Sequence, residues 1–98
     1  MSIENLRTGI DEIDSEIIRL LNRRCELARQ IGAWKHENNL PIYVPEREQQ
    51  LLDRLADHNP GPLDRDSLIA IYREIMSAAI KLEQPMNIAF LGPEGTFS

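Results

Sequence analysis

Two cations on one helix face suggest an anion-binding site. Arg24 and Lys35 are eleven residues apart, close to three helical turns, so they share a stripe about 16 Å long. Arg24 also occupies a position where an apolar residue is expected, and a guanidinium keeps its charge wherever it lies. An unpaired buried charge costs several kcal/mol. The pattern therefore predicts an anionic partner for Arg24, either a ligand or a carboxylate of this protein, unless the side chain extends its charged end outward to water.

Three further side chains can join this site. Arg47 and Glu48 begin a second helical segment, and Glu83 lies near the end of a third on an otherwise apolar stripe. Taken one at a time, Arg47 and Glu48 can also be explained as solvated residues of a first helical turn. Glu83 can likewise be explained as part of a frayed helix end. Together they suit a small polyanion that carries a polar group. Because the set has cations and a carboxylate but no nucleophile, it favours a reaction that needs only binding and charge stabilisation.

Other kinds of chemistry have less support in the sequence. His36 and His58 lack metal-ligand spacing, so no metal or other cofactor is expected. Cys25 is the only cysteine and has no obvious base beside it. The net charge of −5 argues against nucleic acid or an anionic membrane as a partner. With no signal segment or run able to cross a bilayer, a cytoplasmic protein is expected.

A very long first helix must position the two cations. Ser2 is a good N-cap, and the helix is expected to continue until Asn38, Asn39 and Pro41 stop it. Its length of about 54 Å exceeds the roughly 33 Å across a compact globule of this size. Its seam follows a three-four spacing through Ile3, Leu6, Ile10, Ile13, Ile17, Leu20, Leu27, Ile31 and Trp34. About half of that seam would meet water in a monomer, so an intertwined helical homodimer is predicted.

Two shorter helices complete an all-α fold of three helices per chain. Pro45 suits the first position of the second helix, and Asp64 can cap the third, which Pro85 ends. The second helix has one apolar stripe, formed by Leu51, Leu52, Leu55 and Ala56. The third has a seam through Leu68, Ile71, Ile75, Ala78 and Leu82, and a second stripe through Tyr72, Met76, Ala79 and Glu83.

The C-terminal residues differ in composition from the helical part of the chain. Residues 87–91 are strand-like and residues 92–98 are rich in turn formers, but a single strand cannot satisfy its backbone. We therefore divide the chain into a helical domain, residues 1–84, and a linker with the truncated start of an α/β domain, residues 85–98.

The order of charged positions resembles the all-helical chorismate mutases. The resemblance covers nearly all of residues 3–84 and rests on the segments Leu6-Arg7, Ile10-Asp11-Glu12-Ile13-Asp14, Leu21-Asn22-Arg23-Arg24, Glu26-Leu27-Ala28, Ile31-Gly32-Ala33-Trp34-Lys35 and Pro45-Glu46-Arg47-Glu48. Residues 86–98 resemble the start of a prephenate dehydratase domain. The whole chain is thus similar to the N-terminal part of the bifunctional enzymes of phenylalanine biosynthesis.

This resemblance implies that chorismate rearranges to prephenate in two equivalent sites of a homodimer. Arg7 matches the arginine that crosses from the other chain, and the remaining matched residues are Arg24, Lys35, Arg47, Glu48 and Glu83. The sequence departs from some relatives at Val44, where they have Asp, and at Ala79, where they have Ser. Any ligand contact made by those side chains is therefore absent here or reduced to a backbone contact.

Two alternative functions also fit the sequence. A related helical fold supports an isochorismate pyruvate lyase, although the dehydratase-like tail argues against that reaction. The chain can also be read as a non-catalytic helical dimerisation module in which Arg24 is salt-bridged.

Overall fold

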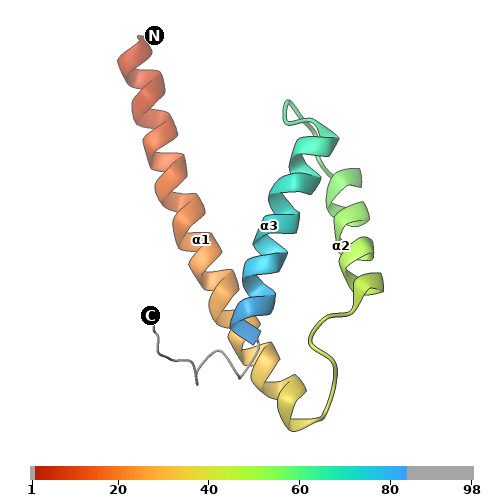
Figure 1. Cartoon of the computed structure of the whole chain (residues 1–98). Helices are drawn as coiled ribbons and strands as arrows, with labels where there is room; N and C mark the ends of the chain where they lie inside the picture. Colours follow the sequence, from red (N-terminus) through yellow and green to blue (C-terminus); the bar gives the residue numbers. More distant parts are fainter. Residues whose placement is uncertain (1, 84–98) are drawn as a thin grey trace, which may run out of the picture.

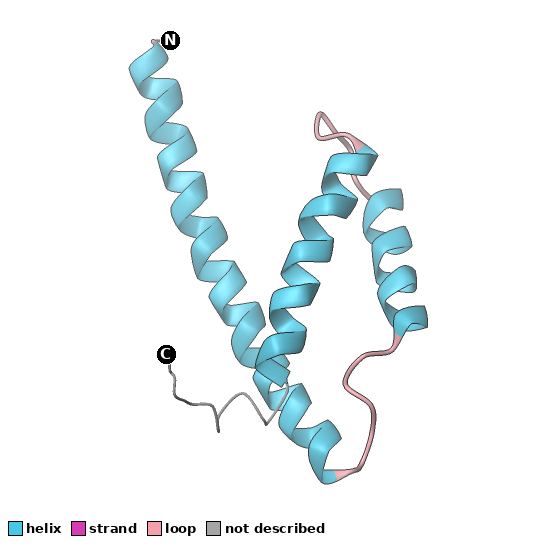
Figure 2. Cartoon of the chain, viewed as in Figure 1, coloured by secondary structure: helices cyan, strands magenta, loops and turns pink. Residues whose placement is uncertain are grey.

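Three helices make up the part of the chain that the structure describes. The computed structural model describes residues 2–83 and places α1 at Ile3–Glu37, α2 at Pro45–Asp57 and α3 at Arg65–Glu83. No strand occurs among these residues, as Figure 2 shows. The prediction of an all-α fold with a very long first helix is confirmed.

Local capping explains where α1 begins and ends. The Ser2 hydroxyl accepts a hydrogen bond from the backbone N–H of Asn5 at 3.2 Å, which makes Ser2 the predicted N-cap. At the other end Asn39 adopts a left-handed φ of 55°, and the Leu40 N–H donates to the Lys35 carbonyl at 2.8 Å. The 35 residues of α1 span about 52 Å, in agreement with the predicted length.

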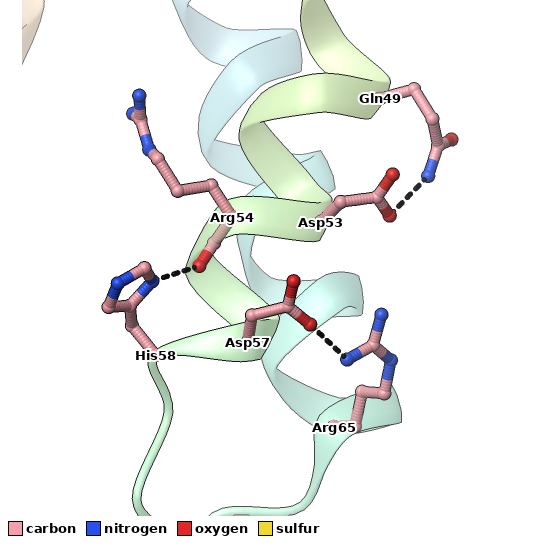
Figure 3. Close-up of polar contacts among 6 residues, drawn as sticks. All are labelled: Gln49, Asp53, Arg54, Asp57, His58 and Arg65. Atoms are coloured by element: carbon pink, nitrogen blue, oxygen red, sulfur yellow. Dashed lines mark hydrogen bonds and ion pairs between the residues drawn. The ribbon is translucent and has the colours of Figure 1, made fainter.

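The starts of α2 and α3 also follow the sequence. Pro45 lies in the first turn of α2, and the Asp64 carboxylate accepts a hydrogen bond from the Ser67 N–H at 2.9 Å. The hydrogen bonds from Ser67 hold the pKa of Asp64 below its ordinary value. Figure 3 shows the exposed ion pair between Asp57 and Arg65, 3.4 Å apart, that links the end of α2 to the start of α3. Exposed pairs of this kind contribute little to stability.

Helix α3 is the central element of the single chain. It packs against both α1 and α2, whereas the backbones of α1 and α2 do not approach each other closely within residues 2–83. In Figure 1, α3 meets α1 near the C-terminal end of α3 and diverges from it toward the N-terminus of α1. The buried apolar residues of this part of the chain are Ala28, Leu52, Ala56, Met76 and Ala79.

The structure distinguishes the two apolar stripes of α3. Met76 and Ala79, on the stripe that leads to Glu83, are buried. On the stripe that the sequence suggested as the seam, Ile71 and Leu82 remain 48% and 43% exposed. The reason is orientation, because α3 turns the Met76 stripe inward and leaves part of the other stripe uncovered.

The apolar seam of α1 is largely uncovered in the single chain. Ile3, Ile10 and Ile13 are each more than half exposed, and every large seam residue from Ile3 to Trp34 is at least 46% exposed. The buried residues of α1 are Ala28 and Gly32, both in its C-terminal half. Exposed apolar strips of this length are typical of interaction surfaces.

Several predictions fall on residues outside the described range. The end of the third helix at Pro85 and the truncated second domain at residues 85–98 both lie there. Among the described residues, no helix is long and apolar enough to cross a membrane. No cluster of His, Cys, Asp or Glu in residues 2–83 has the arrangement of a metal site.

Candidate active site

An open groove of about 900 Å³ lies along the C-terminal half of α1. The α1–α2 loop, α2 and the C-terminal half of α3 form its other walls. All of the predicted site residues except Arg7 line it, namely Arg24, Lys35, Arg47, Glu48 and Glu83. Three helices thus bring together side chains that are up to 59 residues apart in sequence.

Lys35 is held between the loop and α3. Its ammonium donates a hydrogen bond to the Ile42 carbonyl at 3.2 Å and lies 3.7 Å from Glu83 Oε1. The second distance is that of an ion pair and is too long for a good hydrogen bond. Because the side chains of Lys35 and Glu83 are only 25% and 12% exposed, this pair is screened less than a surface pair. An ammonium group has three protons, so the hydrogen bond to Ile42 leaves two of them available to Glu83 or to a ligand.

Glu83 is an under-satisfied buried carboxyl group. Its Oε1 atom is buried and has no hydrogen-bond partner, which is uncommon for a buried polar atom. Burial raises the pKa of Glu83, while the positive charges of Lys35 and Arg24 act in the opposite direction. A carboxyl group with a raised pKa can hold a proton and donate it in a hydrogen bond.

Arg24 presents a charge that the described chain does not neutralise. It is half-buried, lines the groove, and makes no hydrogen bond or ion pair with any residue in the range 2–83. Its charge still reaches Glu83, whose pKa it lowers. The alternative in which Arg24 forms a salt bridge within its own chain therefore has no support among residues 2–83.

The first turn of α2 contributes two opposite charges. Arg47 is exposed and Glu48 is half-buried, and both line the groove without an ion pair to other described residues. Val44 and Ala79, where the sequence departs from some relatives, line the same groove. Neither side chain can supply a hydrogen bond there.

Arg7 lies far from this groove in its own chain. It is exposed in the second turn of α1, 17 residues before Arg24 and therefore about 25 Å away along the helix axis. A rigid helix cannot bring both ends to one small ligand. Any contact of Arg7 with a ligand in such a groove must come from a second copy of the chain.

Sequence reasoning missed two parts of the site. The Ile42 carbonyl fixes Lys35, but a backbone acceptor leaves no signal in residue type. The exposed aromatic residues Trp34 and Tyr43 also line the groove. The sequence assigned Trp34 only to the apolar seam, because its spacing in the helix fits the seam as well as the lining of the groove.

Comparisons with known proteins agree on one family. The family model described as chorismate mutase type II matches residues 6–84. The bifunctional chorismate mutase/prephenate dehydratase of Aquifex aeolicus is 45% identical over 98% of this chain and 28% of its own length. The chain therefore spans about a quarter of the length of the curated relatives it matches.

Solved structures give the same result for the fold. A chorismate mutase from Thermus thermophilus superposes with a TM-score of 0.83 at 37% identity, covering 85% of this chain and 94% of that one. A chorismate mutase from Helicobacter pylori, solved in complex with prephenate, gives a TM-score of 0.78 at 35% identity. That match covers 91% of this chain and 97% of the other.

Proposed function

Because the chain belongs to the chorismate mutase type II family, we propose that it converts chorismate to prephenate by a Claisen rearrangement. The observation that carries the proposal is the groove itself, where Arg24, Lys35 and Glu83 meet without a nucleophile or a metal cluster among the described residues. The reaction is unimolecular and forms no covalent intermediate with the enzyme. It requires a held conformer and a stabilised transition state, which such a groove can supply.

The two carboxylates of chorismate are assigned to arginines. Arg24 has no partner in the described chain, and its guanidinium can bind one carboxylate through two parallel hydrogen bonds. The partner subunit's Arg7 would bind the other, because Arg7 cannot reach the groove of its own chain. Holding both ends selects the chair conformer in which the reacting carbons meet, and this removes much of the entropic barrier.

Lys35 and Glu83 are assigned to the ether oxygen. As its C–O bond breaks, this oxygen gains negative charge, and donors already aimed at it stabilise that charge without reorganisation. Lys35 is fixed by Ile42, and a protonated Glu83 supplies the second donor. Glu48 accepts a hydrogen bond from the ring hydroxyl, while Arg47 orients Glu48.

A homodimer with two shared sites is part of this proposal. The exposed seam of α1 supports it, because a second α1 would cover the residues that α2 and α3 leave open. The proposal also assigns residues 1–84 to the mutase domain and residues 85–98 to the beginning of a prephenate dehydratase domain. A cytoplasmic location and the absence of nucleic-acid and membrane partners stay predictions from composition.

Loss of chorismate absorbance in the ultraviolet tests the activity directly. The purified chain should consume chorismate, and prephenate should be the product after chromatography. Released pyruvate and salicylate from isochorismate would instead indicate the lyase of related fold. If the folded protein turned over neither compound, the remaining interpretation would be a non-catalytic dimerisation module.

The pH profile should report the proton on Glu83. Burial raises the Glu83 pKa, so the donor form persists to a higher pH than in an ordinary glutamate, and kcat/KM should fall as pH rises through that pKa. An ionised carboxylate would repel the developing negative charge. Folding stability should decrease over the same window, because the folded state binds this proton more tightly than the unfolded chain does.

The variant Glu83→Gln separates this role from other causes of pH dependence. Glutamine keeps a donor at every pH, so kcat/KM of Glu83→Gln should stay flat where the wild type falls. Profiles measured from about pH 5 to 9 cover the range above the ordinary carboxyl pKa. If the two proteins gave superimposable profiles, Glu83 would not be the proton donor.

A further inference from the structure

Gly32 permits an unusually close approach of α3 to α1. A Cβ atom built on Gly32 would lie 2.6 Å from the Cα atom of Glu83 and 2.8 Å from both its Cβ atom and its carbonyl oxygen. Real Cβ atoms essentially never make contacts this short, and the obstructing atoms include backbone that cannot rotate away. No side chain other than that of glycine fits between the helices at this point.

The position of Gly32 on α1 connects this helix contact to the charged residues of the groove. The side of α1 that meets α3 runs from Arg24 through Ala28 and Gly32 to Lys35, at steps of four, four and three residues. The two small members are buried, and a cation lies at each end. The backbone of Glu83 therefore rests on Gly32, and its carboxyl group extends one turn along to Lys35, 3.7 Å away.

We infer that Gly32 is a positioning residue for the rearrangement, because the missing side chain places the Glu83 carboxyl group in the buried wall of the groove beside Lys35. This inference rests on the proposed function and adds to it a residue that never touches substrate. An alanine at position 32 would push the last turn of α3 outward. The Glu83 carboxyl group would then move away from Lys35 and toward water.

The charged groups around this carboxyl group all belong to the groove. Lys35 and Arg24 reach it from α1, and Arg47, Glu48 and Arg54 line the groove from α2. The cations of α1 already lower the Glu83 pKa, so burial is what keeps it raised. Displacement toward water should therefore return the pKa to its ordinary carboxyl value.

Gly32→Ala, Glu83→Ala and the double variant form a cycle that tests the inference. Gly32→Ala should lower kcat/KM by about 10- to 100-fold, as expected for a misplacement of about 1 Å. In the Glu83→Ala background the same change should have an effect of about threefold or less, because no carboxyl group remains to be misplaced. An equal loss in both backgrounds would overturn the inference.

Ala33→Ser is the matched control. Ala33 follows Gly32 in the same helix, is exposed and does not line the groove, so one added atom there would meet water instead of α3. Ala33→Ser should therefore keep normal kcat/KM. Circular dichroism and thermal melting of each variant establish that α1 and the fold persist. If Gly32→Ala did not fold, Ala28→Ser would replace it in the cycle. Ala28 is buried one turn away on the same side of α1 but lines the groove, so the Glu83 pKa of that variant, and not kcat/KM alone, would decide the outcome.

A spectroscopic readout tests the inference without activity. Carbon-13 NMR of the carboxyl groups, with the Glu83 signal assigned by its loss in Glu83→Gln, gives the Glu83 pKa in each protein. The Glu83 pKa should be raised in wild type and Ala33→Ser and ordinary in Gly32→Ala. An unchanged Glu83 pKa in Gly32→Ala would contradict the inference, whereas wild-type protein without chorismate turnover would contradict the proposed function alone.

Discussion

Arg24→Ala is expected to lower kcat/KM by about 10²- to 10³-fold, the usual loss when one preorganised charge contact to the transition state is removed. The physical reason is that Arg24 lies half-buried in the groove without a partner in the described chain. Its charge is therefore available to a substrate carboxylate. Removing it should leave the fold and the assembly intact, because no internal ion pair is broken.

Matched variants sharpen this result. Arg23→Ala removes the same charge from the adjacent position, which is exposed and does not line the groove, so it should have nearly normal kcat/KM. Arg24→Met keeps the apolar stem without the charge and should be as impaired as Arg24→Ala. Near-normal turnover by Arg24→Met, measured as loss of chorismate absorbance, would mean that Arg24 does not bind substrate.

Mixing two inactive variants tests whether the sites are shared. Arg7→Ala and Arg24→Ala chains, once their subunits exchange, should form heterodimers in which one site has both arginines and the other has neither. Activity should then recover to about half of the wild-type value per heterodimer. The absence of recovery after exchange has been verified by mass spectrometry would contradict the crossing role of Arg7.

Ile13→Asp should abolish both the dimer and the activity. Ile13 is 59% exposed in the single chain and lies in the part of α1 that α3 does not cover. In a dimer that buries this seam, an unpaired carboxylate at position 13 would lose its hydration, a penalty of several kcal/mol. Because the proposed sites need two chains, turnover should disappear together with the dimer.

Sedimentation velocity at micromolar concentration measures this effect, with Ser15→Asp as the control. Ser15 is exposed and lies about 200° around the helix from Ile13, so it carries the same added charge away from the seam. The wild type and Ser15→Asp should sediment as dimers and remain active. A wild-type monomer that turns over chorismate would contradict both the dimer and the shared site.

Local chemistry in the sequence determined where the helices start. Ser2 and Asp64 cap α1 and α3 through side-chain oxygens that reach backbone N–H groups three residues away. Pro45 begins α2 because its fixed φ suits a first turn. The shared stripe of Arg24 and Lys35 was equally predictable, since a helical repeat fixes it without any tertiary contact.

Only the tertiary structure decided which groups meet across the helices. The contact of Gly32 with Glu83, the hydrogen bond from Lys35 to Ile42 and the choice of the Met76 stripe as the buried face of α3 all depend on how the helices are oriented. Sequence periodicity defines two apolar stripes on α3 but does not determine which of them is buried. The approach of α3 to α1 decides this, and that approach is close because residue 32 has no side chain.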